Sequence, residues 1–248
     1  MLVTGGTRGI GRATVERLLA DGLSVCFCGR DRETGARAER ELAAAGRALF
    51  VPADIASESD VRDLVAVCAQ RLGPPAVLVN NAGVNANFDA AAMTESEWDT
   101  FFGTDLKSAW LCAKHVLPHM LEHRGGAIVN VSSIHASVTL EGFFPYAAAK
   151  AGLTGLTRSL ALDYGTRNIR VNCVCPGFTD TRLVRESINR SPDPDAAERA
   201  MVAGVALGRI AAPAEVAGTI AFLASDDASY VTGATLYVDG GLTARRAG

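Results

Sequence analysis

Short apolar runs alternate with longer amphipathic stretches along most of the chain. The apolar runs are rich in Val, Ile, Leu and Phe, are typical of β-strands, and lie close to residues 2, 23, 48, 76, 127, 169 and 234. Several contain almost no polar residue, as expected for parallel strands that are buried on both faces. Helical periodicity fills the stretches between them, over residues 12–22, 32–46, 57–73, 94–123, 146–165 and 213–225.

This alternation predicts an α/β fold, a doubly wound parallel sheet of about seven strands (a Rossmann fold) with helices on both faces. We find no linker and no internal repeat, and we expect a single domain over residues 1–248. The connection at about 178–207 is unusually long and polar, with Pro192 and Pro194 in its middle. Because such connections tend to be functional or disordered, we interpret it as a mobile substrate lid rather than a disordered surface insertion.

Composition and charge narrow the class of protein. The 248 residues are 48% hydrophobic and 21% charged, which fits one large domain with a substantial core. The net charge is −3 with acids and bases interspersed, so the chain lacks the basic face that a nucleic-acid partner needs. No stretch approaches the roughly 20 apolar residues of a membrane span, and the first residues do not resemble a leader. We therefore expect a cytoplasmic protein without a membrane partner.

Two groups of residues resemble metal ligands only superficially. The pairs C-F-C (26–28) and C-V-C (173–175) lie in strand-like runs, where residues i and i+2 share one face. We expect all six cysteines to be buried, reduced thiols rather than zinc ligands. A helical stretch interrupted by a proline carries histidines at every fourth position, and we interpret them as surface or interface residues: His115, His119 and His123.

A glycine-rich run, TGGTRGIG (residues 4–11), stands between the first predicted strand and the first predicted helix. Glycines let a backbone turn tightly and approach a pyrophosphate, which then faces the positive N-terminus of the following helix. Many turns contain glycines, but this position in an alternating α/β chain indicates a dinucleotide site.

Tyr146 and Lys150 are four residues apart, so they lie on one face of an Ala-rich predicted helix. A phenol, with an ordinary pKa of about 10, is a poor acid–base catalyst at neutral pH, and a neighbouring ammonium group favours the phenolate. Taken alone, the pair is more typical of an exposed, Ala-rich helix surface than of a catalytic site. Ser133, however, ends the preceding strand 13 residues before Tyr146.

At this point the chain resembles the short-chain dehydrogenase/reductase family over essentially its whole length. The loop T-G-x-x-x-G-x-G, N-N-A-G at 80–83, Ser133, Y-x-x-x-K, P-G at 176–177 and the terminal V-D-G-G match in order. The resemblance implies that Tyr146 is the general acid–base, that Ser133 hydrogen-bonds the reacting oxygen, and that Lys150 assists Tyr146. The cofactor-binding residues that it implies are Gly5, Thr7, Arg8, Gly9, Ile10, Gly11, Arg30, Asp54, Asn81, Ala82, Gly83, Tyr146, Lys150, Pro176, Gly177 and Thr181.

The choice of nicotinamide cofactor depends on charge at the tip of the second strand. An acid there binds the ribose 2′-hydroxyl of NAD(H) and repels a 2′-phosphate. Asp31 lies 20 residues past Gly11, but the family's usual acidic position, 18 residues past it, is Gly29. Arg30 follows at once, and Arg8 occupies a basic position in the glycine loop, so we favour NADP(H) over NAD(H).

Substrate-pocket residues are expected after the strand ends and just before Tyr146. The two phenylalanines of LEGFFP favour a moderately apolar small-molecule substrate, although they are equally typical of core or subunit contacts. The candidates are Asn85, His135, Phe143, Phe144 and Phe178. The helices that carry the histidines and Tyr146 commonly form subunit contacts in this family, which implies a homotetramer, with a dimer as the alternative.

Asp105 occupies the family's fourth catalytic position, seven residues after Trp98, where an Asn is usual. The usual amide stabilises a helix irregularity near Lys150. An ionised Asp accepts hydrogen bonds but donates none, and beside Lys150 it opposes phenolate formation at Tyr146. We expect Asp105 to face the site, with activity retained and its pH profile shifted; the alternative is an ordinary surface charge.

The function expected from these residues is NADP(H)-dependent reduction of a carbonyl group or oxidation of a secondary alcohol. An NAD(H)-dependent sugar or polyol dehydrogenase on the same fold is the nearest alternative. A cofactor-binding regulatory protein without turnover is a third hypothesis, which the intact Ser, Tyr and Lys disfavour. No metal is expected.

Overall fold

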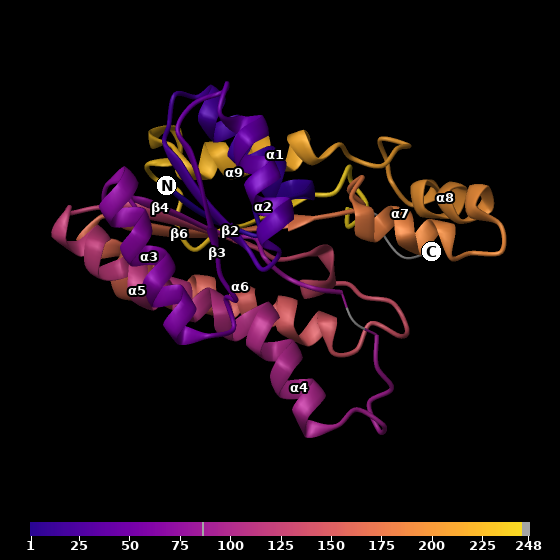
Figure 1. Ribbon diagram of the computed structural model, residues 1–248. Coiled ribbons are helices and arrows are strands. Elements are labelled where there is room, and N and C mark those ends of the chain that lie inside the picture. Colours follow the sequence, from indigo (N-terminus) through magenta and orange to yellow (C-terminus); the bar gives the residue numbers. More distant parts are fainter. Residues whose placement is uncertain (86, 245–248) are drawn as a thin grey trace.

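Seven parallel strands form one sheet in the order β3-β2-β1-β4-β5-β6-β7 (Figure 1). The computed structural model describes residues 1–85 and 87–244 of the chain. The strands are β1 (Leu2–Thr4), β2 (Val25–Gly29), β3 (Ala48–Pro52), β4 (Val77–Asn80), β5 (Gly126–Val131), β6 (Ile169–Pro176) and β7 (Thr235–Val238). The predicted parallel sheet is confirmed, and its order reverses between β1 and β4, where ligands bind in folds of this kind.

Helices cover both faces of the sheet, as the alternating pattern predicts. In Figure 1, α1 (Gly9–Ala20) and α9 (Pro213–Ala224) lie above the sheet with α2 (Arg32–Leu42). On the opposite face lie α3 (Glu58–Leu72), α5 (Ser108–Glu122) and α6 (Tyr146–Tyr164). The remaining helical elements are α4 (Glu95–Phe102), α7 (Arg182–Asn189), α8 (Pro194–Ala203) and the short η1 (Gly103–Lys107), η2 (Ile134–Ala136), η3 (Gly165–Arg167) and η4 (Asp226–Ala228).

The core consists of two apolar layers, one on each face of the sheet. Side chains alternate between the faces along a strand, so Leu2, Leu78 and Ile128 pack with residues of α3 and α5. Their neighbours Val3 and Val79 pack with residues of α1 and α9 on the other face. Burial on both faces explains why these strands are almost wholly apolar.

All six cysteines are buried and free, as the sequence predicts. Cys26 and Cys28 belong to the same apolar layer, which agrees with their i, i+2 spacing in β2. They act as small apolar core residues.

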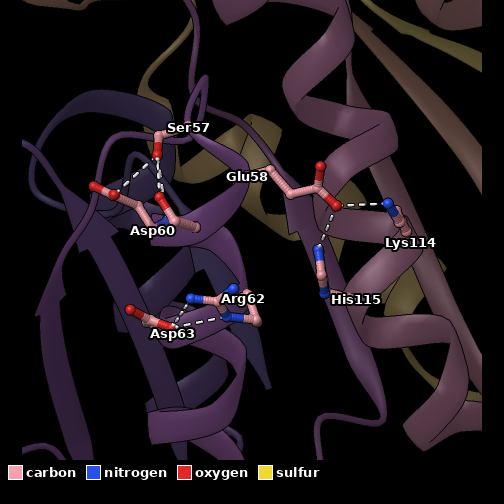
Figure 2. Close-up of polar contacts among 8 residues, drawn as sticks. Ser57, Glu58, Asp60, Arg62, Asp63, Lys114 and His115 are labelled. Carbon is pink, nitrogen blue, oxygen red and sulfur yellow. Dashed lines mark hydrogen bonds and ion pairs between the residues drawn. The ribbon is translucent and has the colours of Figure 1, made fainter.

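Polar contacts join the start of α3 to α5 (Figure 2). The Ser57 hydroxyl caps α3 by accepting from the backbone N–H of Asp60. The carboxylate of Glu58, one residue into the helix, forms ion pairs with Lys114 and with Nε2 of His115, the latter at 3.3 Å. One of the two histidines of α5 therefore takes part in a helix–helix contact.

Two segments differ from the predicted elements. The stretch interpreted as a mobile lid contains α7 and α8, which the pattern did not predict because the segment is rich in charged residues and prolines, and of the two helices only Ile188 is buried. Pro194 occupies the first turn of α8, where a missing N–H costs nothing. The predicted helix over 94–123 is interrupted by a π-helical turn, η1. Among the described residues, no helix has both the length and the apolar character needed to cross a bilayer.

Candidate active site

The glycine loop between β1 and α1 forms an open cradle of backbone N–H groups. Gly5 and Gly9 adopt φ values of +66° and +57°, a left-handed conformation that disfavours side chains. Arg8 stands at the N-cap of α1, and no side chain caps this helix. The first N–H groups of α1 are thus available to an anion, and the helix dipole favours negative charge there. This cradle fits the pyrophosphate of a dinucleotide.

Asn81 fastens the cradle to the centre of the sheet. Its Nδ2 donates hydrogen bonds to the carbonyl oxygens of Thr4 (3.0 Å) and Gly5 (3.2 Å). The Thr4 hydroxyl in turn accepts from the backbone N–H of Asn81 (3.0 Å) and of Ala82 (3.1 Å). Asn81, predicted beside the cofactor, thus acts together with Thr4, although the two residues are more than 70 positions apart in the sequence.

Two arginines flank the carboxyl end of β2, which ends at Gly29 as the sequence indicates. Arg8 and Arg30 are both exposed. The Asp31 carboxylate is occupied elsewhere, because it caps α2 by accepting from the backbone N–H of Thr34 at 2.6 Å. That hydrogen bond is the main cause that lowers the pKa of Asp31, with a smaller contribution from Arg8.

The remaining predicted cofactor residues lie at the carboxyl ends of other strands. Asp54 is exposed just after β3, and its carboxylate accepts from the backbone N–H of Ala56. Thr181 caps α7 and approaches the glycine loop: a Cβ atom at Gly9 would lie 3.3 Å from its methyl carbon. Pro176 ends β6, and Gly177 packs so closely on Asp239 that a Cβ atom would lie 2.8 Å from its Cα.

Helix α6 carries Tyr146 and Lys150 at its N-terminal end. Lys150 is buried, and its Nζ lies 5.4 Å from the centre of the Tyr146 ring. The hydroxyl of Ser132 donates to the backbone carbonyl of Lys150 at 2.7 Å, which ties α6 to the end of β5. Ser133, the next residue, is buried, and its Oγ accepts from the backbone N–H of His135 at 3.3 Å. The structure thus places the three predicted catalytic residues at adjoining element ends.

A series of buried side-chain hydrogen bonds, which the sequence did not predict, holds α6 against the sheet. Asn80 Nδ2 donates to Asn130 Oδ1, and Asn130 Nδ2 donates to the Thr157 hydroxyl, both at 2.9 Å. Thr157 itself donates to the carbonyl of Leu153 within α6. Because buried polar groups are nearly always hydrogen-bonded, these bonds favour a single packing of α6 against β4 and β5.

Asp105 lies inside the site rather than on the surface. It sits on the π-helical turn η1, is almost fully buried, and has its Oδ2 3.2 Å from Lys150 Nζ. Its Oδ1 accepts from the backbone N–H of Val84 at 2.8 Å. Burial lowers the pKa of Lys150, but the Asp105 carboxylate, with Tyr146 after it, outweighs burial, and the net pKa is raised.

Aromatic side chains gather on the substrate side of Tyr146. The His135 ring stacks on Phe143 at 4.2 Å between ring centres and meets the edge of Tyr146 at 5.5 Å. Its Nδ1 lies 2.9 Å from the Thr139 hydroxyl, and burial lowers the pKa of His135. The ring centre of Phe144 lies 6.0 Å from that of Trp98, an aromatic residue that was not predicted to line the pocket.

The other predicted pocket residues are not part of this aromatic group. Asn85 is exposed in the loop after β4. Phe178 lines a small hollow with Leu207 and Val238, beside the connection to α9.

Comparisons with known proteins agree with this architecture. Residues 5–243 match the family model described as enoyl-(acyl carrier protein) reductase. The chain is 37% identical to 3-oxoacyl-(acyl-carrier-protein) reductase of Chlamydia pneumoniae, over 98% of this chain and 96% of that protein. It is 43% identical to cis-4-hydroxycyclohexanecarboxylate dehydrogenase of Sinomonas cyclohexanicum, again over 98% and 96%.

A solved structure of a variant actinorhodin polyketide ketoreductase with NADPH superposes with a TM-score of 0.93. It shares 35% identity and covers 97% of this chain and 95% of its own. These proteins are nicotinamide-dependent oxidoreductases that act on hydroxyl or keto groups. The chain therefore belongs to the short-chain dehydrogenase/reductase family and is itself an oxidoreductase of this kind.

Proposed function

We propose that this protein catalyses the NADP(H)-dependent reduction of a carbonyl group, and the reverse oxidation of a secondary alcohol, through a relay of Ser133, Tyr146 and Lys150. The observation that carries the proposal is the burial of Lys150 on α6, with its Nζ 5.4 Å from the centre of the Tyr146 ring. Both residues lie near the carboxyl end of β5, where Ser132 bonds the Lys150 carbonyl. A lysine is rarely buried without a partner or a function, and here its ammonium group lies between the Asp105 carboxylate and the Tyr146 ring.

Each residue of the relay has a separate role. When bound, the nicotinamide ring supplies or accepts the hydride. Tyr146 exchanges its phenolic proton with the substrate oxygen, and Ser133 donates a hydrogen bond to the same oxygen as negative charge develops on it. Lys150 stabilises the phenolate that Tyr146 becomes after it gives up its proton, and the family resemblance also assigns it the ribose hydroxyls.

Preference for NADP(H) follows from the charges at the tip of β2. Arg8 and Arg30 are exposed there, and Asp31 is occupied as the cap of α2, so it is not directed at a ribose. Two guanidinium groups suit a 2′-phosphate. Dissociation constants for NADPH and NADH test this preference: tighter NADPH binding that Arg30→Ala selectively weakens is expected, and equal or tighter NADH binding would contradict it.

The substrate is inferred to be a small molecule with an apolar part beside its carbonyl group. The stacked rings of His135 and Phe143 next to Tyr146 support this class, because they offer an apolar surface at the position of proton transfer.

Helices α7 and α8 serve as the lid over this pocket. Thr181 at the start of α7 approaches Gly9, so the lid begins against the cofactor cradle. Arg185 forms ion pairs with Asp180 and with Glu198 of α8, which hold the two helices together. Slower backbone hydrogen exchange in 178–207 after NADPH addition is expected; unchanged exchange would remove this role.

A homotetramer is the assembly that we propose. The outer faces of α5 and α6 carry exposed apolar side chains, with Trp110 46% exposed and Leu162 83% exposed. Apolar surface of this kind favours subunit contacts. Light scattering after size-exclusion chromatography measures the assembly directly, and a monomer would contradict the proposal.

The relay is tested by absorbance of the nicotinamide with a panel of ketones and secondary alcohols. We expect turnover in both directions and a loss of at least about a hundredfold in kcat for Tyr146→Phe, since general acid–base catalysis contributes that much. Cofactor binding without turnover of any panel member, together with no effect of Tyr146→Phe, would favour a regulatory protein instead.

A further inference from the structure

The ion pair between Asp105 and Lys150 is enclosed by the protein. The two side chains are 0% and 5% exposed, and 3.2 Å separates Oδ2 from Nζ. The pair joins two elements that are distant in sequence, the π-helical turn η1 and helix α6. A π-helical turn inserts an extra residue into a helix and is frequent at functional sites; here it contains Asp105 itself.

Gly83 provides the space for this pair. A Cβ atom at position 83 would lie 3.0 Å from both Asp105 Oδ2 and Lys150 Nζ, closer than an ordinary contact. The next residue, Val84, holds the other carboxylate oxygen with its backbone N–H. The loop after β4 therefore orients the carboxylate toward Lys150 and leaves no side chain in between.

The charges that face Lys150 come from three elements. Asp105 approaches it from η1, Tyr146 from the preceding turn of α6, and the thiols of Cys173 and Cys175 from β6. The two thiols hydrogen-bond each other, which raises the pKa of Cys173 and lowers the pKa of Cys175, and neither comes as close to Lys150 as the ion-paired carboxylate of Asp105 is shown to. Among these groups Asp105 supplies the negative charge that balances the ammonium, and no water screens the pair as it would at a surface.

We propose that Asp105 is a positioning residue that neutralises Lys150 and thereby keeps Tyr146 protonated, so that the free site is poised to donate a proton to a carbonyl oxygen. This inference rests on the relay described under the proposed function. During reduction the Tyr146 hydroxyl gives its proton to the substrate oxygen, and a water proton restores the phenol. With an uncharged amide at position 105, Lys150 would favour the phenolate, the form that alcohol oxidation requires.

The test titrates the tyrosinate absorbance of the whole protein without substrate. The chain has four tyrosines, so the difference between a protein and its Tyr146→Phe variant isolates Tyr146. We expect Asp105→Asn to move the midpoint of this difference titration down by about one pH unit, the lower end of the effect of one charge at such distances. Asp63→Asn removes an exposed carboxylate on α3 and is the matched control, with no shift expected.

A second variant covers the case in which Asp105→Asn does not fold. Gly83→Ala forces a methyl group against both partners, so it should move the midpoint in the same direction by a smaller amount. A midpoint that stays in place or rises in the folded variants would overturn the inference.

Turnover separates this inference from the proposed function. With ethyl acetoacetate and NADPH for reduction, and ethyl 3-hydroxybutyrate and NADP⁺ for oxidation, Asp105→Asn should shift the oxidative pH–rate profile to lower pH. Turnover with an unshifted titration would refute the role of Asp105 alone. A shifted titration without turnover of these or any panel substrate would instead refute the relay and leave the charge balance standing.

Discussion

Gly11, in the first turn of α1, has no room for a side chain, and this makes Gly11→Ala the sharpest perturbation of the cofactor cradle. A Cβ atom there would lie 2.2 Å from the carbonyl oxygen of Gly5 and 2.4 Å from Asn81 Nδ2. Ordinary contacts begin near 3.4 Å, so the loop and the helix must separate by roughly 1 Å. The same movement breaks the hydrogen bond from Asn81 to Gly5.

The magnitude follows from the cost of inserting a methyl group into a closely packed site, about 1–3 kcal/mol. The free protein relieves the overlap by moving the Gly5 carbonyl outward. Cofactor binding requires the loop in its original position, so the cost appears in the binding free energy. Since each 1.4 kcal/mol changes Kd tenfold, the Kd for NADPH should rise by roughly 5- to 150-fold.

Fluorescence titration with NADPH measures this change, and Gly155→Ala is the matched control. Gly155 lies on α6, and a Cβ atom there would meet only the Arg158 guanidinium at 4.0 Å. Alanine is also the better helix former, so the control should bind NADPH as the wild type does and unfold no more easily. A Gly11→Ala protein that is folded and binds within twofold of wild type would refute the assignment of this loop.

Two further predictions concern stability. Thr157→Val leaves the buried Asn130 amide without its acceptor and should lower the free energy of unfolding, measured by urea titration, by about 1–3 kcal/mol. The control is Thr154→Val, whose hydroxyl donates only within α6 and whose loss should lower that free energy clearly less. Equal losses would contradict the role of the network. Burial lowers the pKa of His135 below 6.5, so the unfolded chain binds more protons than the folded one and stability declines as the pH falls below about 6.5. His135→Gln should flatten that decline between pH 7 and 5.5, and an unchanged slope would show that other groups cause it.

Local pattern was sufficient for most of the fold. The strands are short and mostly apolar, those inside the sheet are buried on both faces, and each helix on the sheet carries an apolar stripe, so the element order follows from periodicity. Right-handed crossovers then leave few ways to arrange a parallel sheet. The glycine loop and the Tyr146–Lys150 pair could be predicted from the sequence for the same reason, since the chemistry of each depends on residues within one or two turns of each other.

Contacts between segments that are distant in the sequence could not be predicted in this way. Thr4 hydrogen-bonds with Asn81, and Asn130 with Thr157, yet nothing in the spacing of these residues marks them as partners. Helices α7 and α8 were missed because the charged residues of this segment and its two prolines, Pro192 and Pro194, are equally typical of a loop. Trp98 reaches Phe144 only because α4 folds back toward the segment before α6.

The sequence by itself determined the fold and predicted the cofactor loop and the reacting groups, because periodic burial and short spacings specify them locally. It also located Asp105 at an unusual position for an acid. Only the tertiary structure decided where that acid lies and which groups it meets. An exposed Asp near a Lys is screened by water and has little effect, whereas η1 and the loop at Gly83 enclose this pair beside the Tyr146 ring.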